Sequence, residues 1–197
     1  TRLQGDWSSD VCSSDLRTQE HQLTARLGQA LEDRFNGNRI AGARLSVITQ
    51  DIPDKGRGAL ERRMGTDLYI GVSVEGDFDK GLLVQSKWSD NKDPNLSAQC
   101  SKMLSFSAAS YVWNYGADGV RVLLARSVLE PGRYVHGELT WSNTVKGMFE
   151  RVLECREGDK RLGVSLGVGR RSRLTNMLDE LAVGTAVSIA ITPDTQE

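Results

Sequence analysis

Three polar side chains lie at or near the ends of two mainly apolar segments. Asp67 opens the segment DLYIGVSV, and Gln85 and Lys87 interrupt the segment GLLVQSKW. Burying an amide or an ammonium without a partner costs several kcal/mol, so these side chains need a polar destination. Aspartate supplies the anionic oxygen that Mg²⁺ prefers, and glutamine can add a neutral carbonyl oxygen. A lysine beside them can offset charge on a reacting phosphoryl group, so the three residue types suit hydrolysis of a phosphodiester.

Two predicted strands must position these residues. Strands place alternate residues on opposite faces, so Gln85 and Lys87 share one side. An antiparallel hairpin that pairs Asp67 with Gln85 also places Leu68 opposite Val84, which gives one apolar face and one polar face. A slip of one residue would mix the two faces. We therefore expect Asp67, Gln85 and Lys87 to converge on one face of adjacent strands.

The remaining elements follow from hydrophobic periodicity and turn residues. We predict helices over residues 20–35 and 95–116 and strands over 43–52, 67–74, 81–88 and 119–126. The signal weakens after residue 127, where we expect helices over 145–157 and 174–181 and a last strand over 186–191. The first two thirds of the chain thus have the order α-β-β-β-α-β.

This order, together with GTDLYI and LLVQSKW, resembles the PD-(D/E)xK nuclease superfamily in its QxK variant, and most closely Mrr-type restriction endonucleases. The resemblance covers about Glu20 to Arg126. It implies an α/β fold with a restriction-endonuclease-like core, in which a central mixed sheet is flanked by helices. It also implies that Asp67 is the metal-binding acid, Gln85 the replacement for the usual glutamate and Lys87 the catalytic lysine. The sequence departs from the pattern in lacking the PD dipeptide.

The superfamily often adds a further acid from its first helix, and two residues compete for that role. Glu20 falls on the same helical stripe as Leu23 and points inward. Glu61 precedes Asp67 by six residues and could reach the same metal. A salt bridge of Glu61 with a neighbouring arginine, and a frayed helix end at Glu20, are the structural alternatives.

The resemblance implies a Mg²⁺-dependent endodeoxyribonuclease, with Mn²⁺ as a substitute and DNA as partner, in restriction or another antiviral defence. A homodimer or a larger defence assembly stays open. The alternative is a nucleic-acid-binding module or an effector subunit whose nuclease site has decayed. Turnover that needs a divalent ion would separate the enzyme from the binding module.

Three further segments have two interpretations each. The basic segment GRRSR, residues 169–173, could touch phosphates or form a solvated helix start. The aromatic segment SYVWNYG, residues 110–116, could stack on bases, but aromatic residues at this density are more typical of a core. Gln99 and Lys102, after the strand of Gln85, either line the cleft or face solvent.

Residues 5–16, GDWSSDVCSSDL, have no apolar periodicity and resemble one reading frame of a sequencing adapter. We therefore expect residues 1–16 to be foreign to the fold, with the native N-terminus lost. Residues 17–126 form the expected catalytic core, and 127–197 an α/β extension of the same domain.

Composition sets broad limits on the remaining chain. Without Arg2, Asp6, Asp10 and Asp15, the 25 basic and 26 acidic residues become 24 and 23, a near-neutral balance that rules out neither nucleic acid nor small molecules. Two distant cysteines, Cys100 and Cys155, then remain, which suggests buried thiols in a reducing compartment. No apolar run approaches the ~18 residues of a membrane span, so we expect no membrane partner and a cytoplasmic location.

Overall fold

The computed structural model describes residues 20–51, 65–88, 93–130, 134–135, 138–139, 143–165, 167–181 and 183–194. Its centre is an eight-stranded mixed sheet in the order β1-β2-β10-β3-β4-β5-β6-β9, and β7 and β8 form a separate pair. The strands are β1 (Arg39–Ile40), β2 (Ala43–Asp51), β3 (Leu68–Val74), β4 (Phe78–Trp88), β5 (Ser110–Gly116), β6 (Gly119–Leu124), β7 (Tyr134–Val135), β8 (Glu138–Leu139), β9 (Asn143–Thr144) and β10 (Thr185–Pro193).

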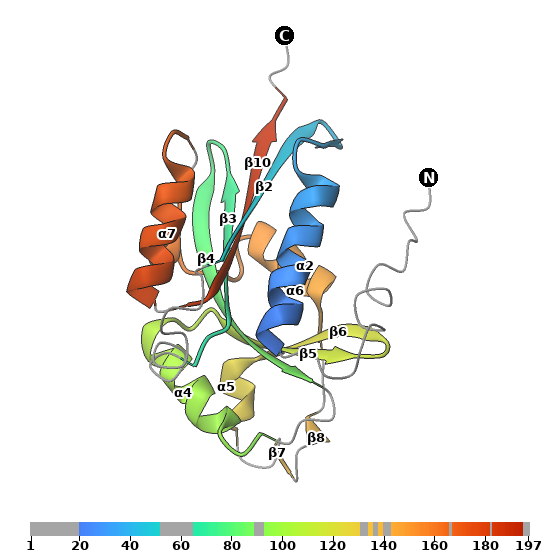
Figure 1. Cartoon of the computed structure of the whole chain (residues 1–197), viewed down its shortest axis with the longest axis vertical. Coiled ribbons are helices and arrows are strands. Elements are labelled where there is room, and N and C mark those ends of the chain that lie inside the picture. The colour runs from blue at the N-terminus through green and yellow to red at the C-terminus, as the bar shows by residue number, and fades with distance from the viewer. Residues whose placement is uncertain are drawn as a thin grey trace.

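Helices cover both faces of the sheet, as expected for strands buried on both sides. The helices are α2 (Glu20–Phe35), α4 (Leu96–Phe106), α5 (Ala125–Val128), α6 (Val145–Leu153), α7 (Arg170–Leu181) and the 3₁₀ helix η1 (Lys160–Leu162). Apolar side chains of α2 and α6 pack on one face, and those of α4, α5 and α7 pack on the other. Figure 1 shows α2 and α7 on opposite sides of the long strands.

The predicted register of the central hairpin is confirmed. β3 and β4 are antiparallel, with Leu68 opposite Val84 and Ile70 opposite Leu82. The ladder ends at Leu68 and Val84, and one residue earlier the bonding is offset, because the backbone N–H of Asp67 donates to Val84 O at 3.0 Å. Hydrophobic pattern therefore predicted this pairing. The expected polar face is wrong, because that face is also a core face in which Tyr69 and Leu83 are fully buried beside Gln85.

The predicted helix over residues 95–116 is wrong in its second half. Helix α4 ends at Phe106, and residues 110–116 form β5, which pairs in parallel with β4. The strand is rich in aromatic and β-branched residues, which favour a pleated surface. It is buried on both faces, so it lacks the polar alternation that would have marked it as a strand.

The last third of the chain contributes an interior strand. β10 lies between β2 and β3, antiparallel to the first and parallel to the second. This strand begins at Thr185 and the helix before it at Arg170, close to the predicted positions. Residues beyond 127 therefore complete the central sheet between two strands from the first half of the chain.

Candidate metal and phosphate site

Asp67 and Gln85 meet across the end of the β3–β4 hairpin. Gln85 Nε2 donates to Asp67 Oδ2 at 2.5 Å, and the backbone N–H of Ser86 donates to the same oxygen at 2.8 Å. Gln85 is only 2 % exposed, and Asp67 is half-buried. The hairpin register thus aims both side chains toward one face of the sheet, the face covered by α4.

The segment before Asp67 packs closely against helix α4. Gly65 has φ +68°, and a Cβ added there would lie 2.9 Å from the Cα of Gln99. A larger residue at this position would be strained both by conformation and by contact. The glycine of the GTD motif therefore allows the strand end and the helix to approach closely.

Three buried oxygen atoms in these segments have no hydrogen-bond partner in the described part of the chain. They are Thr66 Oγ1, Gln85 Oε1 and Gln99 Oε1. An unsatisfied buried acceptor costs about 1–3 kcal/mol, so such atoms are rare unless a ligand, ion or water completes them. Gln85 Oε1 belongs to the same amide whose Nε2 contacts Asp67, so turning the amide over would put a candidate cation ligand beside the carboxylate.

Lys87 lies on the same face of β4 as Gln85 and forms a buried ion pair. Its Nζ is 2.7 Å from Asp93 Oδ2, and the two side chains are 7 % and 14 % exposed. The Lys87 charge also acts on the Cys100 thiol of α4: burial raises the pKa of this thiol to about 12, and the nearby ammonium opposes the increase. The ammonium therefore lies against the beginning of α4.

Asp93 is a site residue that the sequence analysis missed. Its Oδ1 accepts from the backbone N–H of Asn95 at 2.8 Å, and its backbone carbonyl accepts from Leu96 N at 3.2 Å. Burial alone would raise the pKa of the Asp93 carboxyl, but the bonds from Lys87 and Asn95 outweigh it and lower the pKa below its usual value. The local signal was DPN before an apolar helix, since aspartate and proline are typical of helix beginnings.

The two candidates for a further acid lie outside the side chains that the structure describes. Glu61 falls in residues 52–64, and of Glu20 only the backbone, as the first residue of α2, is described. Helix α2 covers the face opposite to Gln85 and Lys87. Its Thr24 Oγ1 donates to Ser86 Oγ at 3.0 Å and lies 3.2 Å from Tyr115 OH. These contacts hold the first half of α2 against the end of β4.

The basic segment at residues 169–173 is used within the fold. Arg170 is 7 % exposed and donates to Ser188 Oγ at 2.7 and 2.9 Å and to Ser46 Oγ at 3.1 Å. Arg171 pairs with Glu32 at 3.2 Å. The interpretation of Arg170 as a phosphate contact or a solvated helix start is therefore wrong, because its guanidinium joins α7 to β10 and β2.

The other open alternatives are resolved by burial. Tyr111, Trp113 and Tyr115 are core residues, each at most 2 % exposed. Gln99 lies against Gly65 beside the site, whereas Lys102 is exposed.

The predicted buried thiols are confirmed in part. Both cysteines in the described residues are free, but only Cys100 is buried; Cys155 is exposed, so the expectation fails there.

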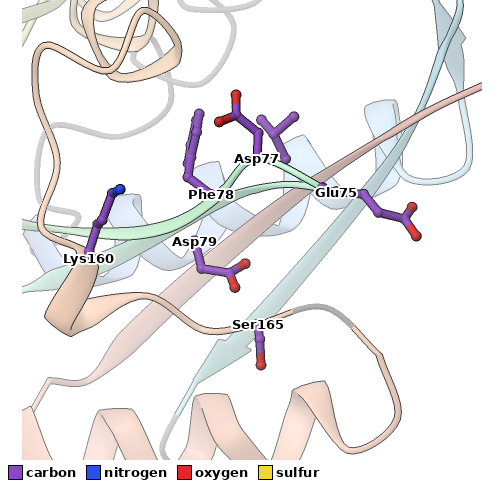
Figure 2. A pocket seen from close by; sticks show the side chains of 8 residues that line it. Glu75, Asp77, Phe78, Asp79, Lys160 and Ser165 are labelled. Atoms are coloured by element: carbon purple, nitrogen blue, oxygen red, sulfur yellow. The ribbon is translucent and has the colours of Figure 1, made fainter.

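Two cavities among the described residues lie away from Asp67. One, of about 540 Å³, lies at the turn between β3 and β4, at the other end of the hairpin. Figure 2 shows its carboxylates, Glu75, Asp77 and Asp79, with Lys160 and Ser165 on the opposing segment. The other, of about 430 Å³, is mainly apolar and lies between α2, α6 and the sheet around Trp113.

Within the described ranges, no group of three or more His, Cys, Asp and Glu side chains could hold a metal ion.

Comparison with protein-family models, with curated proteins and with solved structures finds no match for this chain. Among the helices that the structure describes, none is long and apolar enough to span a bilayer.

Proposed function

We propose that the chain is a Mg²⁺-dependent nuclease that hydrolyses phosphodiester bonds of DNA, with a restriction-endonuclease-like core, acting in restriction or anti-phage defence. The observation that supports this proposal best is the contact between Asp67 and Gln85 at the end of one hairpin. The Gln85 amide touches the Asp67 carboxylate, and Lys87 follows on the same face of β4. These are the residues that the resemblance to the QxK nucleases singles out.

The residues present fit a divalent cation. Asp67 offers a carboxylate, and the buried Gln85 Oε1 is a neutral acceptor without a donor in the described part of the chain. Turning the Gln85 amide over would set Oε1 beside Asp67 Oδ2, and a cation between the two oxygens would remove their repulsion. A bound Mg²⁺ would polarise the phosphoryl oxygen and activate water.

Lys87 would supply a fixed positive charge to the phosphate. Its ammonium is almost fully buried, and an interaction with developing charge is much stronger in such a place than in water. Asp67 and Gln85 would hold the cation, while Lys87 would stabilise the charge that develops on the phosphate.

The same burial favours one alternative, a binding module or effector subunit with a decayed nuclease site. Gln85 Nε2 is turned toward Asp67, and Lys87 is already paired with Asp93, so the polar groups satisfy one another in large part. A decayed site would keep this arrangement. It would bind DNA but would not cleave it when Mg²⁺ is added.

The experiment is cleavage of plasmid DNA by the full chain with Mg²⁺ or Mn²⁺, and with EDTA as control. Lys87→Ala should lower the rate more than a hundredfold, because losing ~3 kcal/mol of transition-state stabilisation has that effect. It should leave DNA binding largely intact, whereas Asp67→Ala should also weaken Mg²⁺ binding, as measured by calorimetry.

Lys146→Ala is the matched control for the loss of a lysine. Its side chain is 84 % exposed and pairs with Glu150 on the same helix. DNA binding without Mg²⁺-dependent cleavage by the wild-type protein would support the binding module and contradict the nuclease.

A further inference from the structure

The two carboxylate oxygens of Asp93 contact different partners. Oδ1 accepts from the backbone N–H of Asn95 at 2.8 Å, which fixes the carboxylate to the start of α4. Oδ2 lies 2.7 Å from Lys87 Nζ. The lysine is thereby held by a group whose own orientation is set by the backbone.

The surroundings of Lys87 make such a partner necessary. Leu83 precedes it on the same face of β4, and Leu96 and Cys100 of α4 belong to the same apolar cluster. An ammonium among such groups is strongly disfavoured unless a counter-ion accompanies it. Without a fixed carboxylate, the flexible lysine stem would carry the charge out toward solvent.

We propose that Asp93 is a positioning residue, whose carboxylate holds the Lys87 ammonium at the end of β4 beside Gln85 and Asp67. The catalytic consequence rests on the proposed nuclease function. Asp93 acts through Lys87, so its loss should lower the rate of the chemical step and leave the binding of metal and DNA unchanged.

The test uses two substitutions in the full chain, Asp93→Asn and Asp93→Ser. Both remove the charge, and both retain a side-chain oxygen that can accept from Asn95 N, so the start of α4 is preserved. We expect kcat for plasmid cleavage to fall on the order of 100-fold, because small displacements of a catalytic group have effects of that size. KM and the Mg²⁺ affinity should stay unchanged.

A double-mutant cycle with Lys87→Met separates positioning from general damage. Asp93→Asn should cause no further loss of single-turnover rate in a chain that already lacks Lys87, because its effect passes through that residue. Asp159→Asn is the matched control, since Asp159 is also a part-buried carboxylate bonded near a helix start but pairs with Arg161 elsewhere. It should leave kcat unchanged.

The outcomes distinguish the two proposals. Wild-type cleavage with both Asp93 variants fully active, or with an additive loss in the Lys87→Met background, would overturn the positioning role alone. If both variants fail to fold while Asp159→Asn folds, the carboxylate is a structural requirement and the positioning role is likewise overturned. No cleavage by the folded wild-type chain would overturn the nuclease function, and this inference with it.

Discussion

Gln85 Nε2 and Asp67 Oδ2 lie 2.5 Å apart across the end of the β3–β4 hairpin, one residue beyond the last pair of the ladder. The contact joins a buried amide to a half-buried carboxylate, and it leaves Gln85 Oε1 without a donor among the described residues. A change in the charge of either side chain therefore changes the electrostatic energy of the other.

Gln85→Glu should make the stability of the chain depend on Mg²⁺. Without a cation, the substitution replaces a donor by a carboxylate next to Asp67, and we expect a loss of about 1–3 kcal/mol. A divalent ion between the two carboxylates would offset the repulsion and bind more tightly than in the wild type. Thermal melting with EDTA and with Mg²⁺ measures both effects.

The wild-type protein melted under the same two conditions is the control for this variant. Equal loss of melting temperature with and without Mg²⁺ would mean that Gln85 is a structural amide.

The features of this site that were predicted from the sequence depend on local pattern. The apolar residues of segments 67–74 and 81–88 predicted the register, and the register brings Asp67 and Gln85 to the same end of the hairpin. The position of β10 between β2 and β3 could not be predicted, because it depends on pairing between segments far apart in the chain.

The wrong predictions concern residues whose structure depends on burial and on partners distant in sequence, rather than on residue type. Residues 110–116 were predicted as helix because a strand buried on both faces carries no alternation. Arg170 was placed at the surface because arginine is rarely buried, and its serine partners lie on strands distant in sequence. Asp93 was missed because the sequence between Lys87 and Asp93 has no hydrophobic pattern that predicts how close the two side chains lie.

Gly81→Ala should destabilise the protein by about 1–3 kcal/mol, the range for overpacked positions. An added Cβ would lie 2.5 Å from Leu162 Cβ and 2.7 Å from the Tyr69 ring, where η1 packs on β4. Backbone bonds between Gly81 and Asp159, at 2.9 and 3.0 Å, keep the two segments from separating. Urea denaturation measures the change.

Gly147→Ala is the matched control for Gly81→Ala. Gly147 lies in α6, and an added Cβ would meet nothing closer than 3.5 Å. Alanine at a helical position is favoured over glycine by roughly 0.5–1 kcal/mol, so this variant should be at least as stable as the wild type. Equal destabilisation by both substitutions would contradict the close packing of η1 on β4.

Arg170→Met should cost about 1–3 kcal/mol, because it removes the donors that satisfy Ser188 and Ser46 under α7. Burial and the charges of Arg171 and Arg173 lower the pKa of this guanidinium, so its environment already disfavours the charge. Replacing a buried charge by an apolar side chain of similar length can offset part of the loss. Chemical denaturation of this variant and of the wild type measures the difference in the free energy of unfolding.

Arg171→Met provides the comparison on the same helix. The Arg171 side chain is 61 % exposed, and its pair with Glu32 should contribute less than about 1 kcal/mol. A larger loss for Arg171→Met than for Arg170→Met would contradict the assignment of Arg170 as the residue that joins α7 to the sheet.

Asp159 should make the protein lose stability in acid over a defined range of pH. The bonds from Arg161 lower the pKa of this carboxyl to about 2, burial acts in the opposite direction, and the bond from Ser107 lowers it further. A carboxyl whose pKa is depressed in the folded state stabilises the fold above its ordinary pKa, 3.8, and loses that contribution as the pH falls to about 2.

Asp159→Asn should therefore lower the melting temperature at neutral pH and flatten its fall between about pH 4 and 2. Asp118→Asn, at a side chain that is 88 % exposed, should keep the wild-type profile. Melting curves collected from pH 7 to pH 2 test this, and parallel profiles for wild type and Asp159→Asn would show that Asp159 contributes no acid sensitivity.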